Sequence, residues 1–301
     1  MSILNQTNDG LFNVLIVLAK CLVFFGPIKK DKLLALCAPA SITDQDMAKK
    51  TLRRWTQIGL FQEYEAEIRF SDELPNKFTR RSFTPDELAD SIRHLIYAPR
   101  NNERFWEKEK SQSADMCRLT AWMLAQDVHQ FRPSNFQQAD DLYVKQINMA
   151  GVERQFTNST RWNGFTSWGT FLGFGGYETG RSSGEFIIDP TSAITKQVIQ
   201  LLPRKKEFPV NEFMAKLADL VPVIDGGVYR REVEDKIREA EWKSTGVSDI
   251  STSLSRALLR LRSQGLIRLE KRSDSDAQLR LIGRGGRVVQ GVTHVQRGDA
   301  K

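Results

Sequence analysis

The segment TDQDMAKKTLRRWTQIGLFQEYEAEIRF, residues 43–70, contains the pattern from which we infer the fold. Its first half predicts a helix that ends at Gly59, because glycine accepts the left-handed backbone conformation that closes many helices. Two short β-prone stretches follow, at residues 60–64 and 67–70, and predict a hairpin. The apolar side of the helix consists of residues that recur at helical intervals: Ala48, Leu52, Trp55 and Ile58.

Two further helices are expected upstream of this segment. Residues 11–25 form an apolar run that stops at Gly26-Pro27, and residues 30–37 form a shorter apolar segment. The first run contains Lys20 and falls short of the roughly 20 residues that cross a bilayer. We therefore expect a buried helix in a cytoplasmic protein without membrane contact. Three helices followed by a hairpin are typical of a winged helix-turn-helix, in which the hairpin is the wing.

The same order of elements is expected near the C-terminus. A strand at residues 267–270 is predicted to pair with residues 278–282 across a polar loop, and a flexible basic tail is predicted beyond them. The helices are expected at residues 190–202, 210–220, 228–242 (an insertion) and 249–264. The third helices of the two modules match, since Leu52, Trp55 and Gly59-Leu60-Phe61 correspond to Leu258, Leu261 and Gly265-Leu266-Ile267.

Between the two modules, the sequence predicts a helical, aromatic-rich region. One of its helices carries Trp162, Phe165 and Trp168 at helical spacing, which favours a packed core face over a surface on which bases stack. The expected helices span residues 85–97, 113–130, 134–149 and 160–172. The fold class is therefore mainly α, with an N-terminal winged helix domain at residues 1–76, a central helical domain at 77–184 and a C-terminal winged helix domain with the basic tail at 185–301.

Composition limits the classes of function. A formal net charge of +7 and a sequence pI near 9.3 permit a polyanionic partner without proving one. Cys21, Cys37 and Cys117 are odd in number and widely spaced, which favours reduced, buried thiols over disulfides or a zinc site. The three histidines are scattered, and we expect no bound metal.

No catalytic motif is convincing in the sequence. The glycines at 173, 175, 176 and 180 lack the Lys-Ser/Thr that follows them in a phosphate-binding loop. Glu234-Asp235-Lys236, with Asp225 upstream, resembles a nuclease element, but the helical charge pattern around it favours a solvated helix face. Asp140-Asp141 is expected to be surface charge. We therefore expect a protein that is not an enzyme and needs no cofactor.

Nucleic-acid binding is the function that the basic residues favour, because they follow the third helices and the predicted wings. Asp44, Asp46 and Asp249 argue the other way, since they lie at the starts of the third helices, where a carboxylate would repel phosphate. Two alternatives fit them: helix caps that face away from DNA, or a module that binds protein. The candidate DNA-contacting residues are Lys49, Lys50, Arg53, Arg54 and Gln57 in the first module, and Arg256, Arg260, Arg262, Arg272, Arg280, Arg284 and Arg287 in the second.

A set of short segments along the chain carries a further signal. They are Asp9-Gly10-Leu11 with Val14-Leu15, Gly26-Pro27, LLALCAP (33–39), TLRRWTQIGLF (51–61), RWNGF (161–165), FLGF (171–174) and Asp189-Pro190-Thr191. Together these segments resemble one known family, the G component of the bacterial 7-deazaguanine DNA modification and restriction cluster (DpdG). The resemblance implies an accessory component of phage defence that acts with helicase-like, ATPase and nuclease partners on DNA lacking the modified base. It supplies no catalytic residues.

Three functions therefore fit the sequence. The first is a DNA-binding accessory subunit that grips nucleic acid through lysine and arginine. The second is an adaptor whose winged helices bridge partner proteins. The third is a transcriptional regulator, which would show operator specificity.

Overall fold

The computed structural model of the chain describes residues 2–4, 12–39, 46–74, 78, 83–107, 112–150, 152, 154–178, 184–204, 206–243, 246–273 and 278–299. The chain divides into two compact units. Unit 1 contains residues 1–116, 151–153 and 158–172, and unit 2 contains residues 117–150, 154–157 and 173–301. Both units are rich in helix and carry small sheets.

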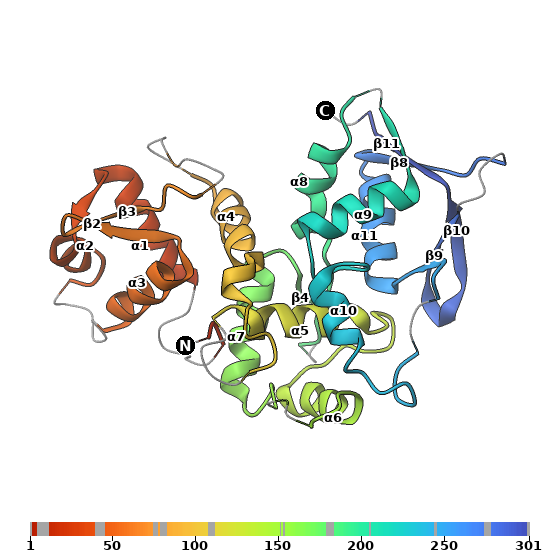
Figure 1. Cartoon of the computed structure of the whole chain (residues 1–301), viewed down its shortest axis with the longest axis horizontal. Coiled ribbons are helices and arrows are strands. Elements are labelled where there is room, and N and C mark those ends of the chain that lie inside the picture. Colours follow the sequence, from red (N-terminus) through yellow and green to blue (C-terminus); the bar gives the residue numbers. More distant parts are fainter. Residues whose placement is uncertain are drawn as a thin grey trace. The chain divides into compact units, whose positions relative to one another are not determined.

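Unit 1 begins with three helices and a small sheet (Figure 1). The sheet is antiparallel, with the strand order β1-β3-β2. Glu65 and Ala66 join β2 to β3 with positive φ angles of 50° and 64°, as a tight two-residue hairpin loop requires. The predicted hairpin is therefore confirmed. The elements are α1 (Phe12–Phe25), β1 (Ile28–Lys29), α2 (Lys30–Cys37), α3 (Asp46–Ile58), β2 (Phe61–Tyr64) and β3 (Glu67–Phe70).

An aromatic cluster forms the core of unit 1. α7 (Ser159–Phe171) buries Trp162, Phe165 and Trp168, so the predicted core face is confirmed. The Trp168 ring lies 5.3 Å from the ring of Trp55, which is fully buried on α3. Phe12 on α1 contacts Trp168 edge-on, with their ring centroids 6.4 Å apart. One aromatic side chain thus joins α1, α3 and α7.

The remaining helix of unit 1 is α4 (Pro85–Tyr97), which the short η1 (Pro99–Asn101) follows. Thr84 caps α4: its side chain accepts a hydrogen bond from the Glu87 backbone, and the Glu87 carboxylate accepts one from the Thr84 backbone. The helix spans the residues that the sequence predicts.

Unit 2 repeats the element order of unit 1 and adds insertions. α8 (Thr191–Leu201), β6 (Glu207–Pro209), α9 (Val210–Leu220), α11 (Thr252–Ser263), β8 (Ile267–Glu270) and β11 (His294–Arg297) follow one another as α1, β1, α2, α3, β2 and β3 do. Their sheet has the order β6-β11-β8, which corresponds to β1-β3-β2. The inserted elements are α10 (Val228–Glu234), β7 (Asp249–Ile250), β9 (Leu279–Ile282), η2 (Arg284–Gly286) and β10 (Val288–Val292).

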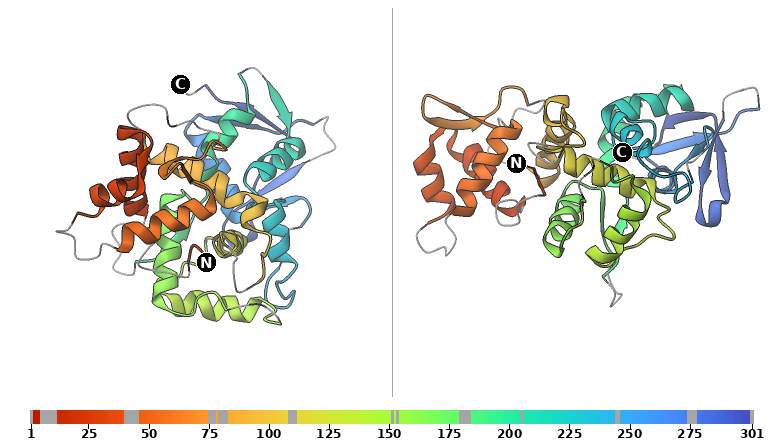
Figure 2. Two further views of the ribbon diagram at one scale, coloured as in Figure 1. Left: turned by 60° about the vertical axis from the view of Figure 1, so that its left-hand side comes forward. Right: turned by 60° about the horizontal axis from the view of Figure 1, so that its bottom comes forward.

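The predicted pairing of residues 267–270 with 278–282 is wrong. β8 instead pairs with β11, where Leu269 lies opposite Val295, while β9 pairs with β10 and β7. The reason is burial: Ile267 and Leu269 need an apolar neighbour, and the fully buried Val295 supplies it between β8 and β6. The predicted flexible tail is also wrong, because the chain forms β10 and β11 there, which are drawn in dark blue in Figure 2.

Further helices of unit 2 lie before the repeat. α5 (Ala114–Ala125), whose first three residues belong to unit 1, and α6 (Phe136–Gln146) confirm two predicted helices. β4 (Gly175–Tyr177) and β5 (Phe186–Ile188) form a two-stranded sheet. The predicted charged helix at 228–242 ends early, at Glu234, because Ile237 leaves the helix to pair with Ile147.

Two side-chain expectations need correction: that Asp140 lies at the surface, and that Cys21 and Cys37 are fully buried. Asp140, expected at the surface, is only 2% exposed, and its carboxylate pairs with Arg154. Cys21 and Cys37 are distant in sequence but lie with their sulfur atoms 3.4 Å apart, both half-buried. Burial, followed by the hydrogen bond to Cys21, raises the pKa of Cys37 to about 12, so the thiol form is favoured. Cys117 is buried, as expected.

Trp168→Ala is expected to lower the free energy of unfolding of unit 1 by about 3–5 kcal/mol, because it leaves a cavity between α1, α3 and α7. Urea unfolding followed by far-ultraviolet circular dichroism measures the change. Phe24→Ala is the matched control, since Phe24 is 69% exposed and its removal costs under about 0.5 kcal/mol. Equal effects of the two substitutions would contradict the assignment of Trp168 to the core.

Candidate nucleic-acid interface

α3 in unit 1 presents an exposed cationic face. Its buried side packs through Leu52 and Trp55, which turns positions 49, 50, 53 and 57 outward. Within the described part of the chain, no carboxylate lies within ion-pair distance of the three cations on this face. Asp44 lies outside the described residues, and Asp46 begins the helix and is exposed. The face consists of Lys49, Lys50, Arg53 and Gln57.

Arg54 does not belong to this face. The sequence places it on the polar side of the helix, but it is only 2% exposed, and its guanidinium donates a hydrogen bond to the Ile3 carbonyl at 3.0 Å. The reason is angular, because position 54 lies on the same side of the helix as the buried residues Thr51 and Ile58. The Arg54 side chain therefore anchors the N-terminal segment of unit 1.

The β2–β3 hairpin beside this face is acidic. It carries Glu63, Glu65 and Glu67, of which only Glu63 has a described lysine partner, Lys30 at 3.3 Å. The one arginine of the hairpin, Arg69, lies over the Tyr64 ring and pairs with an aspartate. Since glutamates repel phosphates, this hairpin is a poorer surface for DNA than the cationic face of α3.

The corresponding helix of unit 2, α11, has compensated charges. Arg256 and Arg260 both pair with Asp189, the former at 3.6 Å. Burial and then repulsion from Arg260 lower the pKa of Arg256. Arg262 donates a hydrogen bond to the Gln290 side chain. These three predicted DNA-contacting residues therefore have partners inside unit 2.

The strands of unit 2 show the same compensation. Arg272 donates to Glu207 at 2.8 Å and to Glu270 at 3.2 Å, and its hydrogen bond is the main reason that the pKa of Glu207 is lowered. Arg280 donates to Asp249 at 2.5 Å. Asp249, which the sequence places at the start of the third helix, instead lies in β7, where it holds an arginine.

The N-terminus of α11 is buried in unit 2. The Ser253 hydroxyl donates to the Leu124 carbonyl at 2.7 Å, and the Thr252 hydroxyl accepts from the Val128 backbone N–H at 3.1 Å. In helix-turn-helix proteins, the residues at this end of the recognition helix contact base edges. That end of α11 is instead occupied by contacts within the protein.

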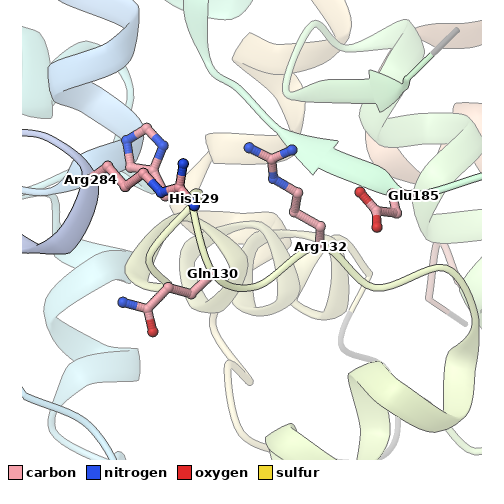
Figure 3. A pocket seen from close by; sticks show the side chains of 5 residues that line it. All are labelled: His129, Gln130, Arg132, Glu185 and Arg284. Carbon is pink, nitrogen blue, oxygen red and sulfur yellow. The ribbon is translucent and has the colours of Figure 1, made fainter. Parts of the chain in front are cut away.

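Arg284 and Arg287 are the exceptions among the predicted arginines of unit 2. Both are exposed, and no carboxylate among the described residues pairs with them. Arg284 lines a polar pocket of about 480 Å³ together with His129, Gln130, Arg132 and Glu185 (Figure 3). No motif in the sequence marks this pocket, because its residues come from three separate segments.

Cationic neighbours influence the histidine of the pocket. Burial is the main cause that lowers the pKa of His129, and the positive charges of Arg256, Arg132 and Arg284 lower it further, against an opposing contribution from Asp127. The imidazole is therefore neutral at neutral pH. The positive charges around the pocket therefore oppose protonation of this imidazole.

The residues set aside as catalytic have structural roles. The Gly173 carbonyl accepts a hydrogen bond from Ala193 at 3.0 Å, and a side chain at Gly173 would collide with α8. Gly180 lies outside the described residues. Asp225 and Glu234 hold Arg230, which is fully buried. Among the described residues, no cluster of three histidine, cysteine or acidic side chains suits a metal ion.

The described helices also bear on membrane contact. None of them is both long enough and apolar enough to span a bilayer.

Comparison with known proteins gives one family. Residues 1–275 match the model of a family described as DpdG-like. No curated protein and no solved structure matches the chain.

Arg132→Ala is expected to raise the pKa of His129 toward its ordinary value, because one of the positive charges that disfavour the imidazolium is removed. Asp127→Asn is expected to lower the same pKa further. A pH titration of the imidazole resonances by NMR measures both shifts, and His129→Gln identifies the resonance. A His129 pKa that neither variant moves would contradict the described environment.

Proposed function

The chain belongs to the DpdG-like family, and on this premise we propose that it is a non-catalytic, DNA-binding accessory subunit of a bacterial defence system. Family membership links the protein to the 7-deazaguanine DNA modification system. The proposal adds that it binds DNA in the cytoplasm and acts beside other subunits, such as a helicase, an ATPase or a nuclease, which supply the chemistry.

The uncompensated positive face of α3 is the observation that carries this proposal. A cation that is already paired with a carboxylate gains little binding free energy from a phosphate. Lys49, Lys50 and Arg53 have no described acidic partner to give up. An α-helix fits the major groove, where Arg53 and Gln57 have the donors and acceptors to contact base edges. The lysines on the same face would neutralise phosphates.

We assign the winged helix arrangement to both repeats, with different tasks. The shared strand orders β1-β3-β2 and β6-β11-β8 support a common architecture. In unit 2, the buried start of α11 and its paired arginines favour a structural role for that helix. Of the predicted residues in unit 2, only Arg284 and Arg287 remain in the proposed interface.

A protein-interaction adaptor is the second candidate, and one observation favours it. α1 and α2 expose the large apolar side chains Val17, Phe24, Phe25 and Leu36, with Phe24 69% exposed. Exposed apolar residues that lie on adjacent helices are typical of a surface that contacts another protein. This surface and the α3 face are distinct, so the two roles are compatible.

Lys49→Glu combined with Arg53→Glu is expected to weaken binding of a short DNA duplex at least about tenfold, because two attractive contacts with phosphate become repulsive. The slope of log affinity against log salt is expected to fall in magnitude by about 2. Fluorescence anisotropy over a salt series measures both quantities.

Lys145→Glu combined with Lys216→Glu is the matched control. It changes the net charge equally at two exposed lysines that already pair with glutamates. The control is expected to change affinity less than about threefold through the overall field alone. Equal losses in the two double variants would show that net charge, and not the α3 face, governs binding.

A further inference from the structure

The polar pocket of unit 2 is built on a rigid loop. The Asp127 carboxylate accepts a hydrogen bond from the His129 backbone N–H at 3.0 Å. The Asp127 backbone carbonyl accepts hydrogen bonds from the backbone N–H groups of Gln130 and Phe131 at 3.0 and 2.9 Å. The Val128 backbone is bound to α11. The backbone of this loop is therefore fixed in place before any ligand arrives, which lowers the entropy cost of binding.

Two guanidinium groups border the pocket, one in a long ion pair and one without a described acidic partner. Arg132 donates through Nε to the Val128 carbonyl at 3.2 Å, and its nearest described carboxylate, that of Glu178, is 3.9 Å away. Arg284 has no carboxylate partner among the described residues. Arginine groups of this kind bind phosphate through paired N–H donors.

The opposite end of the pocket carries an acceptor without a donor. Glu185 Oε2 is buried, and no described atom donates a hydrogen bond to it. In Figure 3 the Arg132 guanidinium lies between the His129 ring and this carboxylate. The Phe186 backbone N–H donates to the Pro133 carbonyl at 2.9 Å, which holds the strand after Glu185 against the loop after Arg132.

We propose that this pocket binds one nucleotide unit, with its phosphate held between Arg132 and Arg284 and a base or sugar donor directed to Glu185. The ligand must carry an anion at one end and an N–H or O–H at the other, and a nucleotide has both. The cavity volume of about 480 Å³ falls within the roughly 300–1,000 Å³ of small-ligand pockets.

The inference deepens the proposed function, and in part rests on it, since the DNA that the chain is proposed to bind consists of such nucleotides. A free nucleotide has the same chemistry. The two sources differ in one respect: a strand brings many phosphates, so its binding weakens far more steeply with salt than that of a mononucleotide.

Binding is linked to proton uptake at His129. The groups that face this imidazole are Asp127, Arg132, Arg256 and Arg284. Burial and the three arginines lower its pKa and favour the neutral form, against the opposing charge of Asp127. A bound phosphate adds negative charge beside it and raises its pKa. The ratio of the affinity of wild-type protein to that of His129→Gln is therefore expected to rise as the pH falls from about 7.5 to about 5.5. The protonation of the ligand's own phosphate, with a pKa of about 6, affects both proteins equally.

The test uses the full chain and three probes: deoxyadenosine 5′-monophosphate, deoxyadenosine, and a short single-stranded DNA. Wild-type protein is expected to bind the nucleotide at least about tenfold more tightly than the nucleoside, because two charge-assisted contacts are lost with the phosphate. Arg132→Ala combined with Arg284→Ala is expected to remove this preference. Arg204→Ala combined with Arg268→Ala is the matched control, since both arginines are exposed and lie outside the pocket lining.

Glu185 is tested separately from the phosphate end. Glu185→Ala is expected to weaken binding of the nucleotide about tenfold and to leave the affinity for inorganic phosphate unchanged, because only the contact with the base or sugar donor is lost. In wild-type protein, saturation with the nucleotide is expected to raise the His129 pKa measured by NMR. This readout needs no substitution, so it stands even if a variant fails to fold.

The outcomes separate the two proposals. One combination of results overturns the pocket and leaves the α3 interface intact. In it, wild-type protein does not bind the nucleotide, and Arg132→Ala combined with Arg284→Ala binds single-stranded DNA as tightly as wild type does. Nucleotide binding that the double variant abolishes supports the pocket even if no DNA binds, and in that case the proposed function fails. Inorganic phosphate that matches the nucleotide in affinity overturns the role of Glu185.

Discussion

The geometry of unit 2 depends on Asp225. Its carboxylate accepts hydrogen bonds from the Ser251 backbone and hydroxyl at 2.6 and 2.7 Å, and it lies 3.5 Å from Arg230. Arg230 is fully buried, so its charge must be neutralised, and Glu234 supplies the second partner at 2.6 Å. The inserted α10 is therefore tied to the residue that caps α11, and this fixes where α11 begins. Thr252 in turn accepts a hydrogen bond from the loop of the pocket, so this ion cluster is connected both to the occluded helix end and to the pocket.

The two repeats show how one element order serves two purposes. α3 and α11 occupy equivalent positions, and both bury an apolar side against neighbouring helices. On α3 the outward lysines and arginine form no ion pair with any described carboxylate, whereas on α11 a single aspartate, Asp189, serves two arginines. Sequence periodicity is the same in both helices. The difference between their charged faces arises from where the acids of other segments are placed.

Local features of the sequence predicted the structure well, and long-range ones did not. The capping box at Thr84 and the hairpin after Gly59 involve neighbouring residues, so their physical causes are visible in the sequence. The partner of β8 is not, because burial of Val295 overrides proximity along the chain. Arg260 is separated from Asp189 by 71 residues, so the local spacing of residues could not predict the ion pair between them. Arg54 was misplaced because it lies at the border of the apolar side, where its burial depends on the N-terminal segment that covers it.

The formal charge of +7 is therefore a poor measure of the surface available to a polyanion. Arg256, Arg260, Arg272 and Arg280 all contribute to the net charge, yet each is paired with a carboxylate. Breaking such a pair exposes the acid as well, so a phosphate gains only the difference between two similar interactions. Among the residues that the structure describes, Lys49, Lys50 and Arg53 on α3 and Arg284 at the pocket of unit 2 are cations for which no acidic partner is found. Each of these surfaces is defined by contacts within its own unit, so each can be tested without assuming how the two units are arranged.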